Sequence, residues 1–433
     1  MRTHELIIYK NLEQEQILND MTFLMENYDN EYYNEEDLKS LLFACTGSIL
    51  ELCVDHGFER NLWHDYLTFL LANDENAYST SCEIVGETGG SINKVALHDF
   101  AIFKELFDYD FSAMEASLGV DCVSMILDYT GSGTHGSVFN GRIRDRICAL
   151  AKSLGQTKDA EEFKASVTQF YKEFGVGKLG LHKAFRVAHD EEGVHIVPIT
   201  KIAHVQLDEL VGYESAKKKL IDNTEAFVKG RRANNCLLFG DAGTGKSSSI
   251  KAILNKYYDQ GLRMIEVYKH QFQDLNDVIA QIKNRNYKFI IYMDDLSFEE
   301  FEIEYKYLKA VIEGGLERKP DNVLIYSTSN RRHLIRESFR DKEERDEELH
   351  TNDTVQEKLS LVARFGVTIY FGKPAKKEFQ EIVRQLAKRN GIEMDEEKLL
   401  LEANRWELNH GGMSGRTAQQ FIDYLLGMET QSC

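Results

Sequence analysis

Eight residues in the second half of the chain, Gly240 to Ser247, constrain the fold more than any other stretch. They read G-D-A-G-T-G-K-S and match the phosphate-binding loop pattern G-x-x-x-x-G-K-[ST] at every fixed position. An apolar run, Cys236 to Phe239, precedes the loop, and a helical pattern, Ser248 to Tyr258, follows it. Only a glycine-rich turn ahead of a helix N-terminus brings enough backbone N–H groups onto a phosphate chain. The order strand, loop, helix therefore predicts a nucleoside triphosphate site.

The individual residues of this loop have distinct expected roles. Gly240, Gly243 and Gly245 supply the turn. Lys246 is expected to reach the β- and γ-phosphates as a point charge, and the Ser247 hydroxyl to ligate the Mg²⁺ that accompanies the nucleotide. The other loop residues expected at the nucleotide are Asp241, Ala242, Thr244 and Ser248.

The 433 residues exceed the size at which one hydrophobic core stops growing, so at least two domains are expected. Apolar residues recur at helical spacing up to about Phe174, which predicts an all-α domain over residues 1–180. The period changes between Ala184 and Pro198, which predicts a hairpin within a linker, residues 181–205. Strands and helices alternate over residues 206–373, and residues 374–433 return to a helical pattern.

The alternating region predicts an α/β core with a five-stranded parallel sheet covered on both faces. Its expected strands are Asn235 to Gly240, Arg263 to Tyr268, Phe289 to Asp294, Val323 to Thr328 and Val367 to Phe371. Three helical segments follow, at 376–390, 395–408 and 414–426, and predict a small C-terminal helical lid.

Charge is divided unevenly along the chain. Residues 1–180 hold 30 acidic and 14 basic side chains, whereas the remaining 253 residues hold 41 and 38. An acidic front part repels phosphate backbones, so a protein partner suits it better than nucleic acid. Acidity that serves only solubility is an equally open interpretation.

Seven scattered cysteines without a C-x-x-C pair favour reduced core residues over disulfides or a zinc site. No run resembles a signal-peptide core or reaches the length of a membrane span. A cytoplasmic protein that does not engage membranes is therefore expected.

Polar side chains close two of the predicted strands. The run F-I-I-Y-M-D-D ends in Asp294 and Asp295. We expect Asp294 to hold Mg²⁺ through water, opposite Ser247, and Asp295 to polarise the attacking water. The run N-V-L-I-Y-S-T-S-N ends in Asn330, whose amide can hydrogen-bond that water or a phosphate oxygen without adding charge.

Arginines at four positions follow these elements. Arg364 comes just before the last strand, where a guanidinium at a subunit edge could reach the nucleotide of a neighbouring subunit. Arg416 opens the last lid helix and is expected to contact the γ-phosphate from above. Arg331 and Arg332 face either a neighbouring subunit or solvent, and the sequence does not choose between them.

This set of residues, in this order, resembles the AAA+ ATPases. The segment L-D-E-L-V-G-Y-E-S-A-K-K-K-L at 207–220 looks like the box ahead of the core in that superfamily, which implies that Val211 and Gly212 lie beside adenine. The resemblance also implies ATP as the nucleotide, strand order 5-1-4-3-2, a C-terminal helical lid, and homo-oligomers that form rings or helices, possible hexamers among them.

Several segments are more closely similar to an uncharacterised bacterial AAA+ family known only as a domain of unknown function. They are A-N-N-C-L-L-F-G-D-A-G-T-G-K-S-S-S, D-D-L-S-F, T-S-N-R-R-H-L and S-G-R-T-A-Q-Q-F, and the similarity covers about residues 180–430. The R-F-G at Arg364 is also similar to the arginine-finger segment of the Holliday-junction branch-migration motor. Related motors often carry glutamate at the position of Asp295. Glu299 and Glu300 are less favoured candidates for activating the attacking water.

Three functions remain in competition. The leading one is an ATPase that hydrolyses ATP to ADP and phosphate, with Asp295 activating water and Arg364 acting in trans, and that remodels an unidentified protein partner. The second is a switch or scaffold that binds ATP but barely hydrolyses it, because aspartate is one methylene shorter than glutamate. The third is a DNA-associated loader or motor, which the basic cluster of Arg331, Arg332 and Arg336 leaves open.

Overall fold

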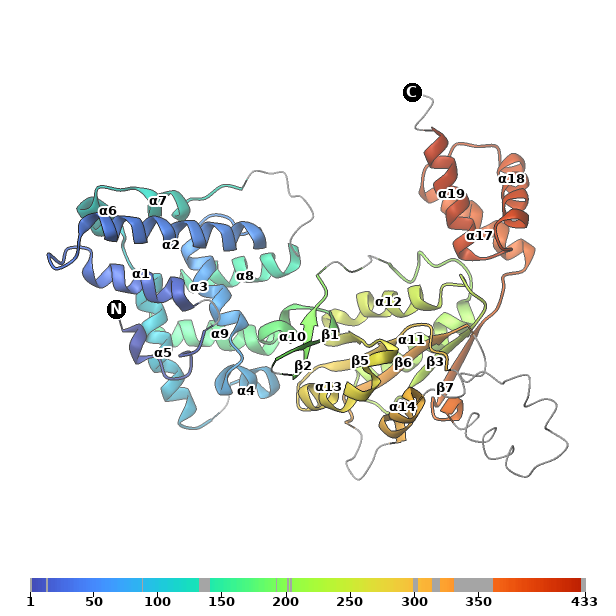
Figure 1. The fold of residues 1–433 in the computed structure, drawn as a ribbon, viewed down its shortest axis with the longest axis horizontal. Coiled ribbons are helices and arrows are strands. Elements are labelled where there is room, and N and C mark those ends of the chain that lie inside the picture. Colours follow the sequence, from blue (N-terminus) through green and yellow to red (C-terminus); the bar gives the residue numbers. More distant parts are fainter. Residues whose placement is uncertain are drawn as a thin grey trace. The chain divides into compact units, whose positions relative to one another are not determined.

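The computed structural model describes residues 2–12, 15–87, 89–131, 141–191, 193–200, 202, 205–298, 303–313, 320–330 and 361–429. The chain divides into two compact units, residues 1–182 and residues 183–433. Figure 1 shows helices throughout the first unit, and a sheet followed by further helices in the second. None of the helices within the described ranges is long and apolar enough to cross a membrane.

Helices make up the described part of the first unit, apart from one isolated bridge between Arg60 and Tyr129. They are η1 (Thr3–Glu5), α1 (Glu15–Asn27), α2 (Glu35–His56), α3 (Leu62–Asn73), α4 (Ala77–Val85), α5 (Ile92–Phe107), α6 (Ser112–Leu118), α7 (Cys122–Leu127), α8 (Gly141–Leu154), α9 (Ala160–Phe174) and α10 (Gly177–Leu181). Local signals set many of their ends. Asn34 caps α2 by accepting the Glu36 N–H, for example, and Gly57 ends that helix in the left-handed region at φ 71°.

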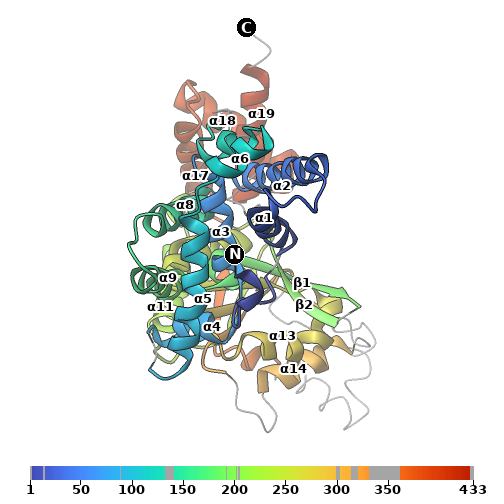
Figure 2. The same ribbon diagram turned by 90° about the vertical axis from the view of Figure 1, so that its left-hand side faces the viewer.

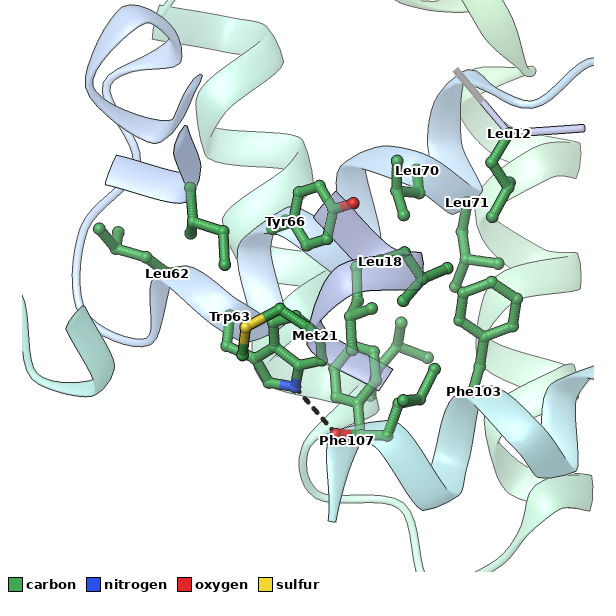
Figure 3. Packing of buried hydrophobic residues seen from close by; sticks show 14 of the residues in the cluster. Leu12, Leu18, Met21, Leu62, Trp63, Tyr66, Leu70, Leu71, Phe103 and Phe107 are labelled. Carbon is green, nitrogen blue, oxygen red and sulfur yellow. Dashed lines mark hydrogen bonds between the residues drawn. The ribbon is translucent and has the colours of Figure 1, made fainter. Parts of the chain in front are cut away.

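One large hydrophobic core holds this unit together. Figure 3 shows Leu18 and Met21 of α1 packing beside Trp63 of α3 and Phe107 of α5. The Trp63 indole is buried and its Nε1–H donates to the Leu106 carbonyl at 2.9 Å. An aromatic ring of this size can be buried at low cost because its one polar atom has a partner.

A buried carboxylate ties the N-terminal segment to α5. Asp99 is fully buried and accepts the backbone N–H groups of Ile7, Ile8 and Tyr9, the shortest at 2.7 Å from Ile8. These donors compensate the burial of the charge. This side chain thus joins residues 7–9 to α5.

We predict that Asp99→Asn loosens this segment, because the amide is uncharged and its NH₂ group replaces one of the two oxygens that accept from Ile7. Hydrogen exchange of the amides at residues 7–9 is expected to quicken at least about tenfold. The exposed Asp55→Asn is the matched control. Unchanged protection at residues 7–9 in the Asp99 variant would refute the role given to this carboxylate.

The second unit is built on a seven-stranded sheet in the order β2-β1-β4-β5-β6-β3-β7. Its strands are β1 (Ala184–Asp190), β2 (Gly193–Pro198), β3 (Cys236–Gly240), β4 (Leu262–Glu266), β5 (Lys288–Met293), β6 (Val323–Ser329) and β7 (Val367–Phe371). All neighbouring pairs are parallel except β1 with β2. Counted from β3, the five strands of the core follow the order 5-1-4-3-2.

The sheet is wider than the predicted five strands because the hairpin belongs to it. Residues Ala184 to Arg186 of β1 pair in parallel with Met264 to Glu266 of β4. The segment expected to serve as a linker thus covers the edge of β4, which would otherwise present unpaired backbone groups. Short-range sequence patterns predict the hairpin but not the distant strand that it joins.

Helices cover both faces of the sheet, and three further helices after β7 form the lid. The bounds are α11 (Glu214–Val228), α12 (Lys246–Tyr257), η2 (Tyr258–Gln260), η3 (Lys269–Asp274), α13 (Leu275–Ile282), α14 (Glu304–Glu313), α17 (Lys376–Arg389), α18 (Glu396–Asn409) and α19 (Gly415–Glu429). Helices α13 and α14 lie side by side in both views (Figure 1, Figure 2). The lid helices share a core of their own, which includes Phe379, Ala403 and Ile422.

Candidate functional site

A cavity of about 840 Å³ opens at the carboxyl ends of the central strands, beneath the lid. Four segments line it. They are the glycine loop with the start of α12 (242–249), the strand ends (Asp294, Asp295, Thr328, Asn330 and Phe371), the segment before α11 with the first turn of that helix (Val205, 209–213 and Lys217), and the lid (Ile382, Leu386, Arg389, Asn390, Gly415, Arg416, Gln419 and Gln420). Ligands of parallel α/β sheets bind at this position.

The glycines of the loop meet different requirements. Gly240 has φ 138°, and a Cβ there would lie 2.0 Å from the Phe371 carbonyl oxygen of β7. A Cβ on Gly243 would meet the Ser414 hydroxyl at 2.9 Å, where the lid comes down on the loop. Gly245 precedes α12 at φ 88° with open space beside it. All three thus have a positive φ that glycine tolerates, and at Gly240 the lack of a side chain also permits the close approach of β7.

Lys246 places its ammonium group at the base of the cavity. The side chain is 6 % exposed, and Nζ donates to the carbonyls of Gly240 at 3.0 Å and Asp241 at 2.6 Å. Burial lowers the pKa of Lys246, and the nearby charges of Asp295 and Asp241 partly oppose that shift. The first turn of α12 therefore presents a fixed cation beside the backbone N–H groups of the loop.

Asp294 is held by two hydroxyl donors. Ser247 Oγ donates to Asp294 Oδ1 at 2.7 Å, and Thr328 Oγ1 donates to the same oxygen at 2.5 Å. Burial on its own would raise the pKa of Asp294, but the hydrogen bonds from Thr328 and Ser247 together hold this pKa below its usual value. The carboxyl group is thus ionised at neutral pH.

These oxygens fit a magnesium ion. Ser247 Oγ can ligate Mg²⁺ directly while its hydroxyl donates to Asp294 Oδ1 at 2.7 Å, which places Asp294 to contact the ion through a water ligand. Among the residues that the structure describes, no group of three or more His, Cys, Asp or Glu side chains could hold a metal by itself. Mg²⁺ would therefore need phosphate oxygens and water as its other ligands, which is its usual arrangement with nucleotides.

Asp295 and Asn330 form a second pair at the strand ends. Asn330 Nδ2 donates to Asp295 Oδ1 at 2.7 Å, and Asn330 Oδ1 accepts from Lys246 at 3.0 Å. Asp295 has a positive φ of 49°, and its N–H donates to Thr328 Oγ1 at 2.9 Å. An unfavourable backbone conformation held by its surroundings in this way is typical of functional sites. The structure brings Lys246, Asn330 and Asp295 into one hydrogen-bonded chain.

The predicted arginines occupy different places. Arg416 lines the cavity, its N–H donates to the Gly243 carbonyl at 3.2 Å, and its charge contributes to the lowered pKa of Lys246. Arg364 does not line the cavity of its own chain, and its guanidinium pairs with Glu313. Two cations thus converge on the loop, while Arg364 lies elsewhere.

Two loop residues that we expected at the nucleotide do not line the cavity. Gly240 and Asp241 are absent from its lining among the described residues. The Asp241 carboxylate instead accepts the Lys373 N–H at 3.0 Å, in the connection between β7 and the lid. Val211 and Gly212, which the resemblance places beside adenine, do line the cavity. Its remaining predicted lining residues are Ala242, Gly243, Thr244, Gly245, Ser247 and Ser248.

Sequence reasoning missed several residues of the site, among them Thr328, Tyr213, Lys217 and Arg389. Thr328 could have been found, because the register pairs Met293 with Ser327 and so sets Thr328 beside Asp294. Tyr213, Lys217 and Arg389 carry no local signal, since they reach the site only through the packing of α11 and the lid. Glu299, Glu300, Arg331, Arg332 and Arg336 lie outside the described residues.

The glycine loop, the acids at the end of β5, the strand order and the helical lid together define an AAA+ protein. The chain belongs to the family described as "Protein of unknown function (DUF815)", whose model matches residues 180–429.

Other similarities are partial. A segment of 81 residues is 33 % identical to the replication factor C large subunit of Staphylothermus marinus and spans 18 % of each protein. Among solved structures, the RuvB Holliday junction branch migration motor of Thermotoga maritima is 15 % identical over 51 % of this chain and 72 % of its own, with a TM-score of 0.32. The AAA domain of FIGL-1 in complex with ADP is 16 % identical over the same shares, with a TM-score of 0.34.

Proposed function

We propose that this protein binds Mg²⁺-ATP in the cavity under the lid, hydrolyses it to ADP and phosphate, and uses the cycle to remodel a protein partner. One observation carries the proposal. Lys246, Asp294, Asp295 and Asn330 come from three different elements, and their side chains meet in one cavity beside Arg416. Such convergence of cations, a metal-binding acid and a candidate base is what phosphoryl transfer requires.

The side chains divide the chemistry between them. Lys246 and Arg416 would neutralise the charge of the phosphates. Ser247 and Asp294 would hold Mg²⁺, which supplies further charge neutralisation at the β- and γ-phosphates. Asp295 would accept the proton of the attacking water, and Asn330 would fix both Asp295 and the water. The hydrogen bond from Asn330 to Asp295 supports this division, because it sets the direction of the carboxylate.

A neighbouring subunit would complete the site. Arg364 lies away from the cavity of its own chain, and its partner Glu313 is partly exposed. In the oligomer, the Arg364 guanidinium would exchange Glu313 for a phosphate of the next subunit, since arginine binds both carboxylate and phosphate oxygens. We therefore propose a homo-oligomer, in ring or helical form, in which Arg364 acts in trans.

We propose that the acidic helical unit, residues 1–182, binds the protein partner. Its excess of acidic residues favours a basic protein surface over nucleic acid.

The Asp295→Asn protein should retain ATP and therefore stay bound to its partner. Affinity purification of this variant from cells in ATP is expected to enrich a protein that Lys246→Ala does not enrich. Enrichment of nucleic acid alone would contradict the assignment.

A slowly hydrolysing switch is the second candidate. Its support is the Asp295 carboxylate, which is one methylene shorter than glutamate and already engaged by Asn330. Under this alternative, the wild-type protein binds ATP but releases phosphate no faster than Asp295→Asn. The proposed ATPase should exceed that variant by about 10²-fold or more, the usual contribution of a general base.

A further inference from the structure

Three consecutive backbone carbonyls beside the cavity are held by two cationic side chains. Arg389 donates from Nη2 to the Asp208 carbonyl and from Nη1 to the Glu209 carbonyl, each at 2.6 Å. Lys217 Nζ donates to the next carbonyl, that of Leu210, at 2.7 Å. Hydrogen bonds from charged donors are the stronger kind, so the segment 208–210 is firmly fixed.

The two cations come from opposite sides of the site. Lys217 lies on α11 in the core, is buried, and also pairs with Glu214 at 2.7 Å. Arg389 is the last residue of α17 in the lid and is exposed. The segment 208–210 is therefore fastened to the core through Lys217 and to the lid through Arg389.

The fastened segment leads directly into a strained turn that lines the cavity. Gly212 has φ 82° and the following Tyr213 has φ 60°, which is uncommon for a residue with a side chain. Such a turn persists only when contacts on both sides hold it. On its far side, the Tyr213 hydroxyl donates to the Gly372 carbonyl at 2.9 Å. On its near side, Lys217 and Arg389 hold the carbonyls.

The end of the cavity next to this turn is mostly apolar. Val211 packs against the hydrophobic core of the lid, and Ile382 and Leu386 of α17 line the same cavity. Asn390 donates its amide to the Leu386 carbonyl at 2.8 Å. The cations stand at the other end of the cavity, Lys246 in the glycine loop and Arg416 in α19 beside Gly243. This division suits a ligand with a flat, weakly polar ring at one end and phosphates at the other.

We propose that Arg389 is a positioning residue for the nucleoside end of the ligand. It joins the lid to the segment 208–212 and so sets the width of the apolar slot, without contact to the phosphates. This inference rests on the proposed nucleotide site. Lysine at this position could reach only one of the two carbonyls, because the bidentate geometry belongs to the guanidinium group.

The test compares two ligands that share a triphosphate but differ in the nucleoside. The imido analogue of ATP and inorganic tripolyphosphate are titrated calorimetrically with Mg²⁺ into the full chain. In Arg389→Ala, affinity for the ATP analogue is expected to fall about tenfold while affinity for tripolyphosphate stays unchanged. The affinity of Arg389→Lys for the ATP analogue should lie between those of the wild type and Arg389→Ala. Arg405→Ala is the matched control, since this exposed lid arginine pairs with Glu402 of its own helix, α18.

Two results would overturn the inference while the nucleotide site survives. One is an equal loss of affinity for both ligands in Arg389→Ala, which would indicate a general effect on the lid. The other is unchanged affinity for the ATP analogue. If the wild-type chain binds neither ligand, or binds the analogue no more tightly than tripolyphosphate, the nucleotide site itself is wrong and the inference falls with it.

Discussion

Lys246→Ala is expected to abolish nucleotide binding. The glycine loop positions this ammonium group at its base through the carbonyls of Gly240 and Asp241. Two charge-assisted contacts to phosphate at 1.5–3 kcal/mol each correspond to a loss of about 10²–10⁴-fold in affinity. Titration with fluorescent ATP in the presence of Mg²⁺ measures this loss directly.

Lys256→Ala is the control for this substitution, because Lys256 lies on the same helix but is exposed and contacts the Tyr257 ring. It removes the same charge from the chain without touching the cavity. Binding by Lys246→Ala within threefold of the wild type would show that the loop does not serve phosphate recognition. Loss of binding in both variants would point instead to a general electrostatic effect.

Arg364→Ala is expected to bind ATP normally and to lose turnover by about 10³-fold, the effect of removing an arginine that stabilises the transition-state charge. The separation arises because Arg364 does not line the cavity of its own chain. A mixture of Arg364→Ala and Lys246→Ala subunits should regain part of the activity, since each variant supplies what the other lacks. Steady-state phosphate release measures both effects.

Glu313→Gln controls for the ion pair, since it removes the carboxylate of that pair and leaves the guanidinium in place. Its turnover should equal or exceed that of the wild type. Full activity in Arg364→Ala would exclude the trans mechanism. A variant that no longer binds ATP would place Arg364 in the binding site of its own subunit instead.

Local patterns predicted the parts of the fold that local patterns control. The strand expected at Val367 to Phe371 matches β7, and the helix expected at 376–390 matches α17 to within one residue. Buried parallel strands are continuous apolar runs, and the apolar residues of the lid helices recur with a 3.6-residue period. Both elements can therefore be predicted without tertiary information. The acids after β5 and Asn330 after β6 were predictable for the same reason, because each ends such a run.

The remainder depended on contacts between distant segments. No short pattern indicates that β1 extends the sheet beside β4, or that the Asp241 carboxylate accepts the Lys373 N–H. The hydrogen bond from Arg389 to the Glu209 carbonyl, 180 residues away, likewise cannot be predicted from the sequence. In the sequence, Arg389 is one of several basic residues near the end of a helix. Motifs predict the phosphate end of the site well, whereas the nucleoside end is assembled by packing.

The central claim is that the cavity hydrolyses ATP with Asp295 as the base. Steady-state release of phosphate from Mg²⁺-ATP by the full chain tests it most directly, with Asp295→Asn and Lys246→Ala measured beside the wild type. The proposed mechanism predicts wild-type turnover at least about 10² times that of Asp295→Asn, and none in Lys246→Ala. Equal rates in the wild type and Asp295→Asn, with ATP bound by both, would contradict it.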